Sequence, residues 1–238
     1  MRWGLFRGSL KLEASTSYDA YEQKLYSGHY EFALPNPYQT ITSFSHGYHA
    51  FGKMGDDQNF YGIILVRKDS PIEKVEDLRG KAISYPAPTA LAASMLPQWF
   101  MYQHGLKITT DVDNRYVGSQ ESSIMNVALG LTQAGCTWPP PWQAFIQTHP
   151  DLADKLQIKW KTETLPNNGL VARDDVPADV VKQVGELIFS LHTTEQGRAI
   201  LAPMELSRFE AATNDTYAPV NAFLERFKQE VRPLEPSR

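Results

Sequence analysis

Short apolar segments of strand length alternate along this chain with longer segments that have the polar starts and glycine ends of helices. The pattern predicts strands at 9–14, 30–34, 59–67, 81–85, 115–117, 133–137, 156–162 and 169–173. Between them it predicts helices, among them 18–26, a helix opened by Thr89, and 124–131, and it favours helix for most of the chain from Ala178 onwards. Strands separated by helices indicate βαβ units, and therefore an α/β fold with mainly parallel sheets.

Two proline-rich segments interrupt this pattern. Prolines on both sides of Asn36 predict a rigid, exposed turn that no helix continues through. Three consecutive prolines separate Trp138 from Trp142 and predict a stiff, extended segment that carries two indole rings. Such a segment suits either the wall of a cleft or a docking face.

Composition and charge narrow the class of protein. The 238 residues are 42% hydrophobic, which indicates an ordinary globular protein rather than a disordered one. A net charge of −4 argues against nucleic acid as the main partner. The single cysteine excludes an internal disulfide. No apolar run approaches the roughly 20 residues needed to cross a bilayer, and the first seven residues are not an intact signal peptide.

Enzyme motifs are missing from the sequence. It contains no glycine-rich nucleotide loop, no zinc-protease motif and no nucleophile elbow. His46 and His49 lie three residues apart, but loop histidines explain them better than a metal site does. Cys136 has no base near it in the sequence, so a buried structural thiol is the favoured interpretation. We therefore expect no catalytic residues, no metal and no cofactor.

The sequence features typical of ligand binding are stronger than those typical of catalysis or metal binding. Three polar turns, 15–18, 87–89 and 118–123, each follow an expected strand and lead into a helix. In open α/β sheets ligands bind at such junctions, where free N–H groups favour anions and polar acceptors. The same turns could simply cap their helices. Aromatic residues at strand ends and turns, Tyr18, Tyr38, Trp138 and Trp142, could line a cleft.

The order of these segments resembles the phosphate/phosphonate-type substrate-binding proteins of ABC transporters, which have the two-lobed type 2 periplasmic-binding fold. The residues that carry the resemblance are Ala14–Tyr21 with Leu25–Leu34, Val66–Ile72, the segment Asp77-Leu-Arg-Gly-Lys81, Gly118–Ile124, and Leu170–Pro177. The match spans most of the chain. It implies two lobes, each a mainly parallel sheet flanked by helices, with a ligand cleft between them. Residues 1–66 and 168–238 would form lobe one, and 67–167 would form lobe two.

The resemblance also implies the ligand-binding residues. Tyr18 matches an aromatic residue of the cleft, Asn36 and Tyr38 lie on the second turn of lobe one, and Thr89 lies in the helix start that receives the anion. Residues Ser119, Gln120 and Ser122 belong to a turn that contributes a histidine in many members, and Gln120 takes that place here. Trp138 would form part of the wall of the cleft. The anion-receiving turn has one hydroxyl residue here, so we expect a less charged or bulkier ligand than a phosphonate dianion.

The expected role is therefore capture of a small polar or anionic solute, and its delivery to an ABC permease by a periplasmic or lipid-anchored protein. The family opens with a strand and a helix that precede residue 10, so we expect this chain to be truncated at its N-terminus. Two alternatives remain open at this point. One is a sensing domain of the same fold that feeds a signalling protein. The other is an enzyme on this scaffold, such as a pyrimidine-precursor synthase, for which Cys136 would be the candidate residue.

Overall fold

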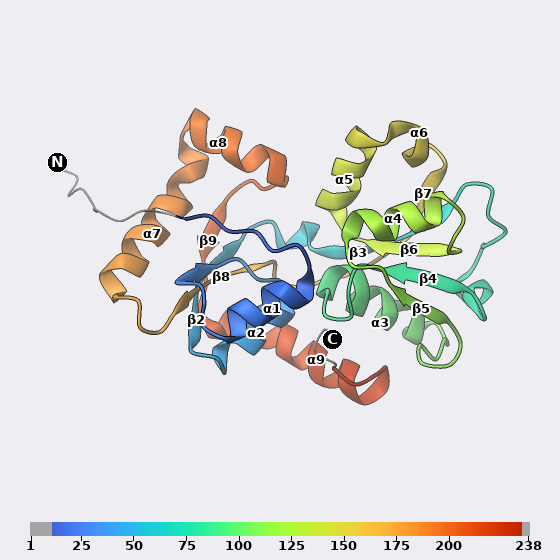
Figure 1. Cartoon of the computed structure of the whole chain (residues 1–238), viewed down its shortest axis with the longest axis horizontal. Helices are drawn as coiled ribbons and strands as arrows, with labels where there is room; N and C mark the ends of the chain where they lie inside the picture. Colours follow the sequence, from blue (N-terminus) through green and yellow to red (C-terminus); the bar gives the residue numbers. More distant parts are fainter. Residues whose placement is uncertain (1–10, 235–238) are drawn as a thin grey trace.

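The computed structural model describes residues 11–234 and has two lobes, each built on one β-sheet with helices packed against it (Figure 1). The first sheet contains, in spatial order, β1 (Phe32–Ala33), β8 (Gly169–Arg173), β2 (Tyr48–Met54) and β9 (Phe209–Ala211). The second contains β5 (Asp113–Tyr116), β4 (Ala82–Tyr85), β6 (Ala134–Thr137), β3 (Tyr61–Arg67) and β7 (Leu156–Thr164). The expected two-lobed α/β fold is confirmed.

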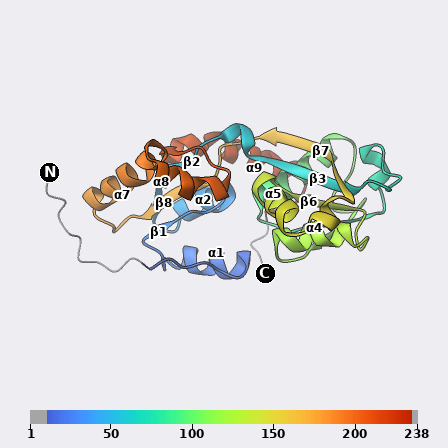
Figure 2. The ribbon, with the colours of Figure 1, turned by 90° about the horizontal axis from the view of Figure 1, so that it is seen from above.

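Helices cover both sheets. Those of the first lobe are α1 (Tyr18–Tyr26), α2 (Pro37–Phe44), α7 (Ala178–Ser190) and α8 (Glu195–Leu201). Those of the second lobe are α3 (Leu96–Gln103), α4 (Gln120–Ala128), α5 (Pro139–Thr148) and α6 (Pro150–Ala153). Short helical turns are η1 (Asp57–Asn59), η2 (Val75–Leu78), η3 (Leu91–Met95), η4 (Leu191–Thr193), η5 (Ala202–Met204) and η6 (Asn214–Tyr217). Figure 2 shows the two lobes side by side, viewed from above.

The last helix, α9 (Ala218–Glu230), links the two lobes. It starts beside the first sheet and extends towards the second lobe (Figure 1). Phe223 and Phe227 on its apolar face are fully buried in the largest hydrophobic cluster, together with Leu96 and Trp99 of α3. Burial of a Phe side chain stabilises a fold by roughly 1.5–3 kcal/mol. The C-terminal helix is therefore part of the packing that holds the second lobe in place.

The expectation of mainly parallel sheets is wrong in detail. Every described pairing of the first sheet is antiparallel. In the second sheet β4 pairs in parallel with β5 and β6, whereas β3 pairs antiparallel with β6 and β7. The cause is the connections: β2 leads to β3, and β7 to β8, through short segments that pass from one sheet to the other. A strand that enters a sheet this way needs no crossover helix and can run against its neighbours.

The course of β3 also bears on where the lobes divide. Residues 61–66, which the expected division assigned to lobe one, are part of β3 and pair within the second sheet. The connection between the sheets therefore lies at about residues 55–60 on the outward path. On the return path it lies between β7 and β8, at residues 165–168.

A polar cluster fixes both connections to the first lobe. Lys53, which is 5% exposed, donates to Asp57 Oδ1 at 2.7 Å and pairs with Glu210 at 2.6 Å. The same Asp57 oxygen accepts from the backbone N–H of Asn167 at 2.9 Å, and the Asn167 amide donates to the Gly55 carbonyl at 2.9 Å. Because the outward and return segments share this cluster, they are held together at their first-lobe end.

This cluster predicts part of the acid sensitivity of the protein. The hydrogen bond from Lys53 is the main reason why the pKa of Glu210 lies below its ordinary value of 4.5. A lowered folded-state pKa adds stability above the unfolded pKa, and that stability is lost as the pH falls through the folded value. We expect the free energy of unfolding to fall on acidification below pH 4.5, and to fall less in Glu210→Gln.

Urea unfolding at neutral pH and below pH 4 would measure this difference. Glu186→Gln is the matched control, because Glu186 pairs with Lys182 at 3.9 Å and both side chains are exposed. An equal loss of stability in Glu210→Gln and in the unchanged protein would contradict the assignment.

Three local expectations have different outcomes. The helix at 18–26 is confirmed as α1, and the Ser17 side chain caps it by accepting from the Ala20 N–H. The strand expected at 9–14 is wrong over its described part, because residues 11–14 have no strand partner; residues 9 and 10 lie outside the described range. The extended segment expected after Trp138 is also wrong: helix α5 begins at Pro139. Proline fits the first turn of a helix, where its missing N–H is not needed.

Candidate functional site

A cavity of two compartments is lined by residues of both lobes. The outer compartment has a volume of about 400 Å³ and the inner one of about 50 Å³. Four residues line both: Tyr18, Asn36, Gln120 and Asn168. The first two come from the first lobe, Gln120 from the second, and Asn168 from the return connection between the sheets. The cavity is therefore positioned to respond to any movement of one lobe against the other.

Tyr18 and Gln120 meet across the cavity. The Thr137 hydroxyl donates to Gln120 Oε1 at 2.9 Å, which turns the Gln120 amide group so that Nε2 donates to the Tyr18 hydroxyl oxygen at 3.1 Å. The Tyr18 oxygen accepts this bond, so its own proton is available to a ligand. Burial raises the pKa of Tyr18, and the hydrogen bond from Gln120 opposes that rise. Tyr18 therefore stays a neutral donor.

The inner compartment lies at the start of a helix. Its wall is formed by Ala90, Leu91, Ala92 and Ala93, the N-cap and first residues of η3, which continues into α3. Phe60 and Trp138 close it from another side, with ring centroids 5.6 Å apart. The first N–H groups of a helix have no partner within the helix and carry partial positive charge. Small alanine side chains leave these groups accessible, so the compartment suits a small anionic group.

Asn36 fixes the first-lobe wall. Its side chain accepts from the Gln39 N–H at 3.1 Å and so caps α2, while the Gln39 side chain accepts from the Asn36 N–H at 3.1 Å. The Asn36 amide nitrogen donates to the Thr89 carbonyl in the second lobe at 3.2 Å. The expected rigid turn at 35–37 is therefore the N-terminus of a helix that no pattern in the sequence indicated.

The outer compartment has an uncharged lining that combines apolar surface with several hydroxyl and amide groups. It is completed by Ser15, Thr16, Ser17, Tyr21, Leu34, Gln39, Gly118 and Ser119. Ser119 is the N-cap of α4 and accepts from the Ser122 N–H at 3.0 Å. Hydroxyl and amide groups can donate to or accept from a ligand without a formal charge. This compartment suits the polar substituent of a ligand whose anionic group lies deeper.

The structure brings together five of the eight expected site residues. Tyr18, Asn36, Ser119, Gln120 and Trp138 all line one or both compartments. The other three do not line them. Tyr38 is 8% exposed in the hydrophobic core, Thr89 is fully buried behind Ala90, and Ser122 bonds to Ser119.

Sequence reasoning missed two lining residues of the connecting segments. Asn168 lines both compartments, and its side-chain oxygen is buried without a hydrogen-bond partner in the described structure. Phe60 ends the outward connection. The run Pro166-Asn-Asn-Gly169 was a turn signal that could have marked Asn168. An amide at this place can bond a ligand and tie it to the return connection.

Other chemistry is weakly supported. Cys136 is fully buried, and burial raises the pKa of its thiol well above the ordinary value, which disfavours the reactive thiolate. Within residues 11–234, no group of three or more His, Cys, Asp or Glu side chains could hold a metal ion. In the same range, no helix is both long and apolar enough to cross a membrane.

Fold and cavity together define the class of two-lobed binding proteins that hold a ligand between their lobes. The chain belongs to the family described as "ABC transporter, phosphonate, periplasmic substrate-binding protein", whose model matches residues 8–217. It is 18% identical over 165 residues to the phosphonates-binding periplasmic protein of Escherichia coli, covering 68% of this chain and 49% of that protein. The chain therefore spans about half the length of this curated relative.

Solved structures agree with the fold. A binding protein component of an ABC phosphonate transporter from Pseudomonas aeruginosa superposes with a TM-score of 0.81 at 17% identity, covering 90% of this chain and 74% of that one. PhnD1 from Prochlorococcus marinus, in complex with methylphosphonate, superposes with a TM-score of 0.78 at 16% identity. The match covers 90% of this chain and 84% of PhnD1. The periplasmic aliphatic sulphonate-binding protein of Escherichia coli superposes with a TM-score of 0.55 at 18% identity. The match covers 93% of this chain and 68% of that protein.

Proposed function

We propose that this protein captures a small oxyanion in the cavity between its lobes and delivers it to an ABC permease, without catalysing a reaction. The observation that carries the proposal is the Tyr18–Gln120 contact across a cavity that ends at the start of η3. The anionic group would lie in the inner compartment against the N–H groups of residues 91–93. The rest of the ligand would occupy the outer compartment.

The family supports the transport side of this proposal. Its members are periplasmic substrate-binding proteins of ABC transporters, so we propose the periplasm as the place of action. The hydrogen bonds that join the lobes beside the cavity include Gln120 to Tyr18, Asn36 to the Thr89 carbonyl, and Thr89 to Glu22. These bonds would form as the lobes close on a ligand. Closure would present the loaded surface to a permease.

Calorimetric titration with methylphosphonate and methanesulfonate tests the proposal, together with Tyr18→Phe. This substitution keeps the ring and removes the hydroxyl that faces the cavity. A hydrogen bond to a charged group contributes about 1.5–3 kcal/mol, so we expect the affinity to fall by roughly 10- to 100-fold.

Tyr102→Phe is the control, since Tyr102 lies on α3 and lines neither compartment. The proposal would be wrong if neither oxyanion bound, or if Tyr102→Phe weakened binding as much as Tyr18→Phe.

A further inference from the structure

Glu22 is a carboxylate in an unusual environment. It lies on α1, is 4% exposed, and its Oε1 accepts from the Thr89 hydroxyl at 2.6 Å and from Gln39 Nε2 at 3.0 Å. Among residues 11–234, no Lys, Arg or His forms an ion pair with it. Two neutral donors therefore hold this buried carboxylate, without an opposite charge beside it.

Glu22 is one hydrogen bond away from both compartments. Gln39, one of its donors, lines the outer compartment. Thr89, the other, directly precedes Ala90 in the wall of the inner compartment. The charge also acts on Tyr18, where it adds to the rise in pKa that burial causes. Any anion in the cavity is therefore within the electrostatic field of this carboxylate.

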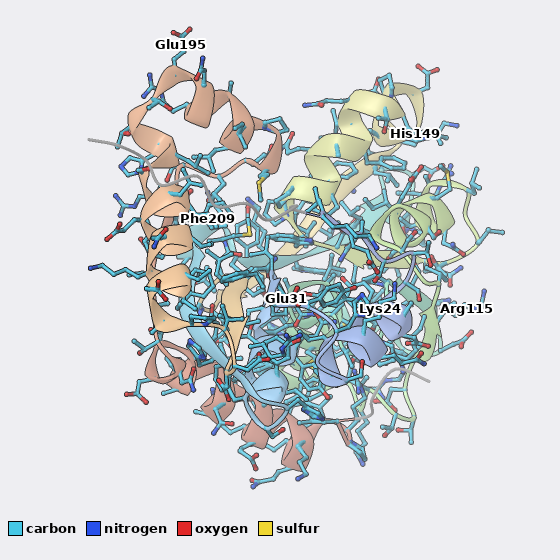
Figure 3. All side chains as sticks on the ribbon, turned by 60° about the vertical axis from the view of Figure 1, so that its left-hand side comes forward. Lys24, Glu31, Arg115, His149, Glu195 and Phe209 are labelled. Atoms are coloured by element: carbon cyan, nitrogen blue, oxygen red, sulfur yellow. The ribbon has the colours of Figure 1, made fainter. Side chains whose placement is uncertain are left out.

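The cavity offers little positive charge to balance it. The described lining of both compartments contains no Lys, Arg or His. Lys24 pairs with Glu13 and Arg115 pairs with Asp113, both on the outside of the molecule (Figure 3). Arg232 reaches the loop before η3, but it donates to the Pro88 carbonyl at 2.7 Å and to Gln98 at 2.8 Å. A ligand is left with neutral hydrogen-bond donors and helix N–H groups.

We propose that Glu22 is a specificity-determining residue that makes this cavity select singly charged oxyanions over dianions. The inference rests on the proposed function, since it concerns the same cavity. Neutral donors can hold one negative charge, but each further charge is repelled by a carboxylate that the protein interior screens only weakly. The same arrangement explains why Thr89, expected to bind the anion, is directed at Glu22 instead.

Two ligands of similar shape and different charge test the inference. Methanesulfonate carries one negative charge, whereas methylphosphonate carries two at about pH 9, well above the second ionisation of such groups. We expect the unchanged protein to bind methanesulfonate more tightly at this pH. In Glu22→Gln, which keeps an acceptor for Thr89 and Gln39, we expect the ratio of the two affinities to shift by at least tenfold towards methylphosphonate.

The control and the outcomes separate the two proposals. Glu31→Gln removes a first-lobe carboxylate that pairs on the surface with Arg173, and should leave the ratio unchanged. If both ligands bind and the ratio is the same in Glu22→Gln, the role of Glu22 is wrong while the proposed function stands. Tighter binding of methylphosphonate than of methanesulfonate by the unchanged protein would also overturn the role of Glu22. This result does not depend on whether any variant folds. If no oxyanion binds any of these proteins, the proposed function itself fails.

Discussion

Replacing Gly62 with alanine should lower the free energy of unfolding by about 3 kcal/mol, at the upper end of the usual cost of overpacking. Gly62 lies in β3, where η3 passes so close that an added Cβ would overlap the Ala92 carbonyl oxygen and lie 2.8 Å from the Pro97 ring. The Ala92 contact is with backbone, so no side-chain rotation can relieve it. The strand and the helix start must move apart.

Urea unfolding would measure this loss, and Gly130→Asn is the control. Gly130 has a φ of +74° just after α4, and an added Cβ there would meet nothing within 4 Å. Asn tolerates that left-handed conformation, so we expect a cost of about 1 kcal/mol or less. Equal stability of Gly62→Ala and the unchanged protein would show that β3 and η3 are not packed as described.

The same glycine connects stability with ligand binding. Ala92, whose carbonyl faces Gly62, is also part of the inner-compartment wall. Displacing it would move the helix N–H groups away from Tyr18 and Gln120, which reach the compartment from other elements. A well-oriented anion site depends on such positions to within about 0.5 Å. The cavity therefore depends on a position where only glycine fits.

Local signals in the sequence were sufficient for some elements. Candidate caps at residues 15–17 and the closing Gly28 predicted α1, because the residues that start and stop a helix act within one turn of it. Pro139 was an ambiguous signal, because proline is compatible with both an extended segment and the first turn of a helix. Burial of Trp142 at 7% exposure against the second lobe selected the helix. That selection depends on packing, which the segment itself does not encode.

The ligand-binding site shows even more clearly that local sequence does not encode contacts between distant segments. Tyr18 and Gln120 could be predicted because each lies at a polar turn that leads into a helix, whereas Asn36 was indicated only by the family resemblance. Glu22 could not, since it sits among polar residues of α1 and looks like part of an exposed face. Its burial depends on Thr89, 67 residues away, and on Gln39, 17 residues away. Asn168 likewise reaches the cavity only because the chain crosses between the sheets at that point.

Replacing Gln120 with glutamate should weaken oxyanion binding by at least about 100-fold. The expected loss is this large because the ligand loses a charged hydrogen bond and is also repelled by the new carboxylate. The change is isosteric, and the Thr137 hydroxyl can still donate to one carboxylate oxygen. The other oxygen would then accept from the Tyr18 hydroxyl, which reverses the present bond from Gln120 Nε2. The ligand loses the Tyr18 proton and meets a new negative charge in both compartments.

Calorimetric titration with methanesulfonate, beside a thermal unfolding curve, would show whether this loss is specific. Gln133→Glu is the matched control: Gln133 accepts from the Ala82 N–H at 3.1 Å and lines neither compartment. It adds the same charge to the same lobe, and we expect it to reduce affinity by less than about threefold, since surface charges are screened by salt. If Gln120→Glu bound the oxyanion as tightly as Gln133→Glu does, Gln120 would have no part in ligand binding, and the Tyr18–Gln120 contact would serve only to join the lobes.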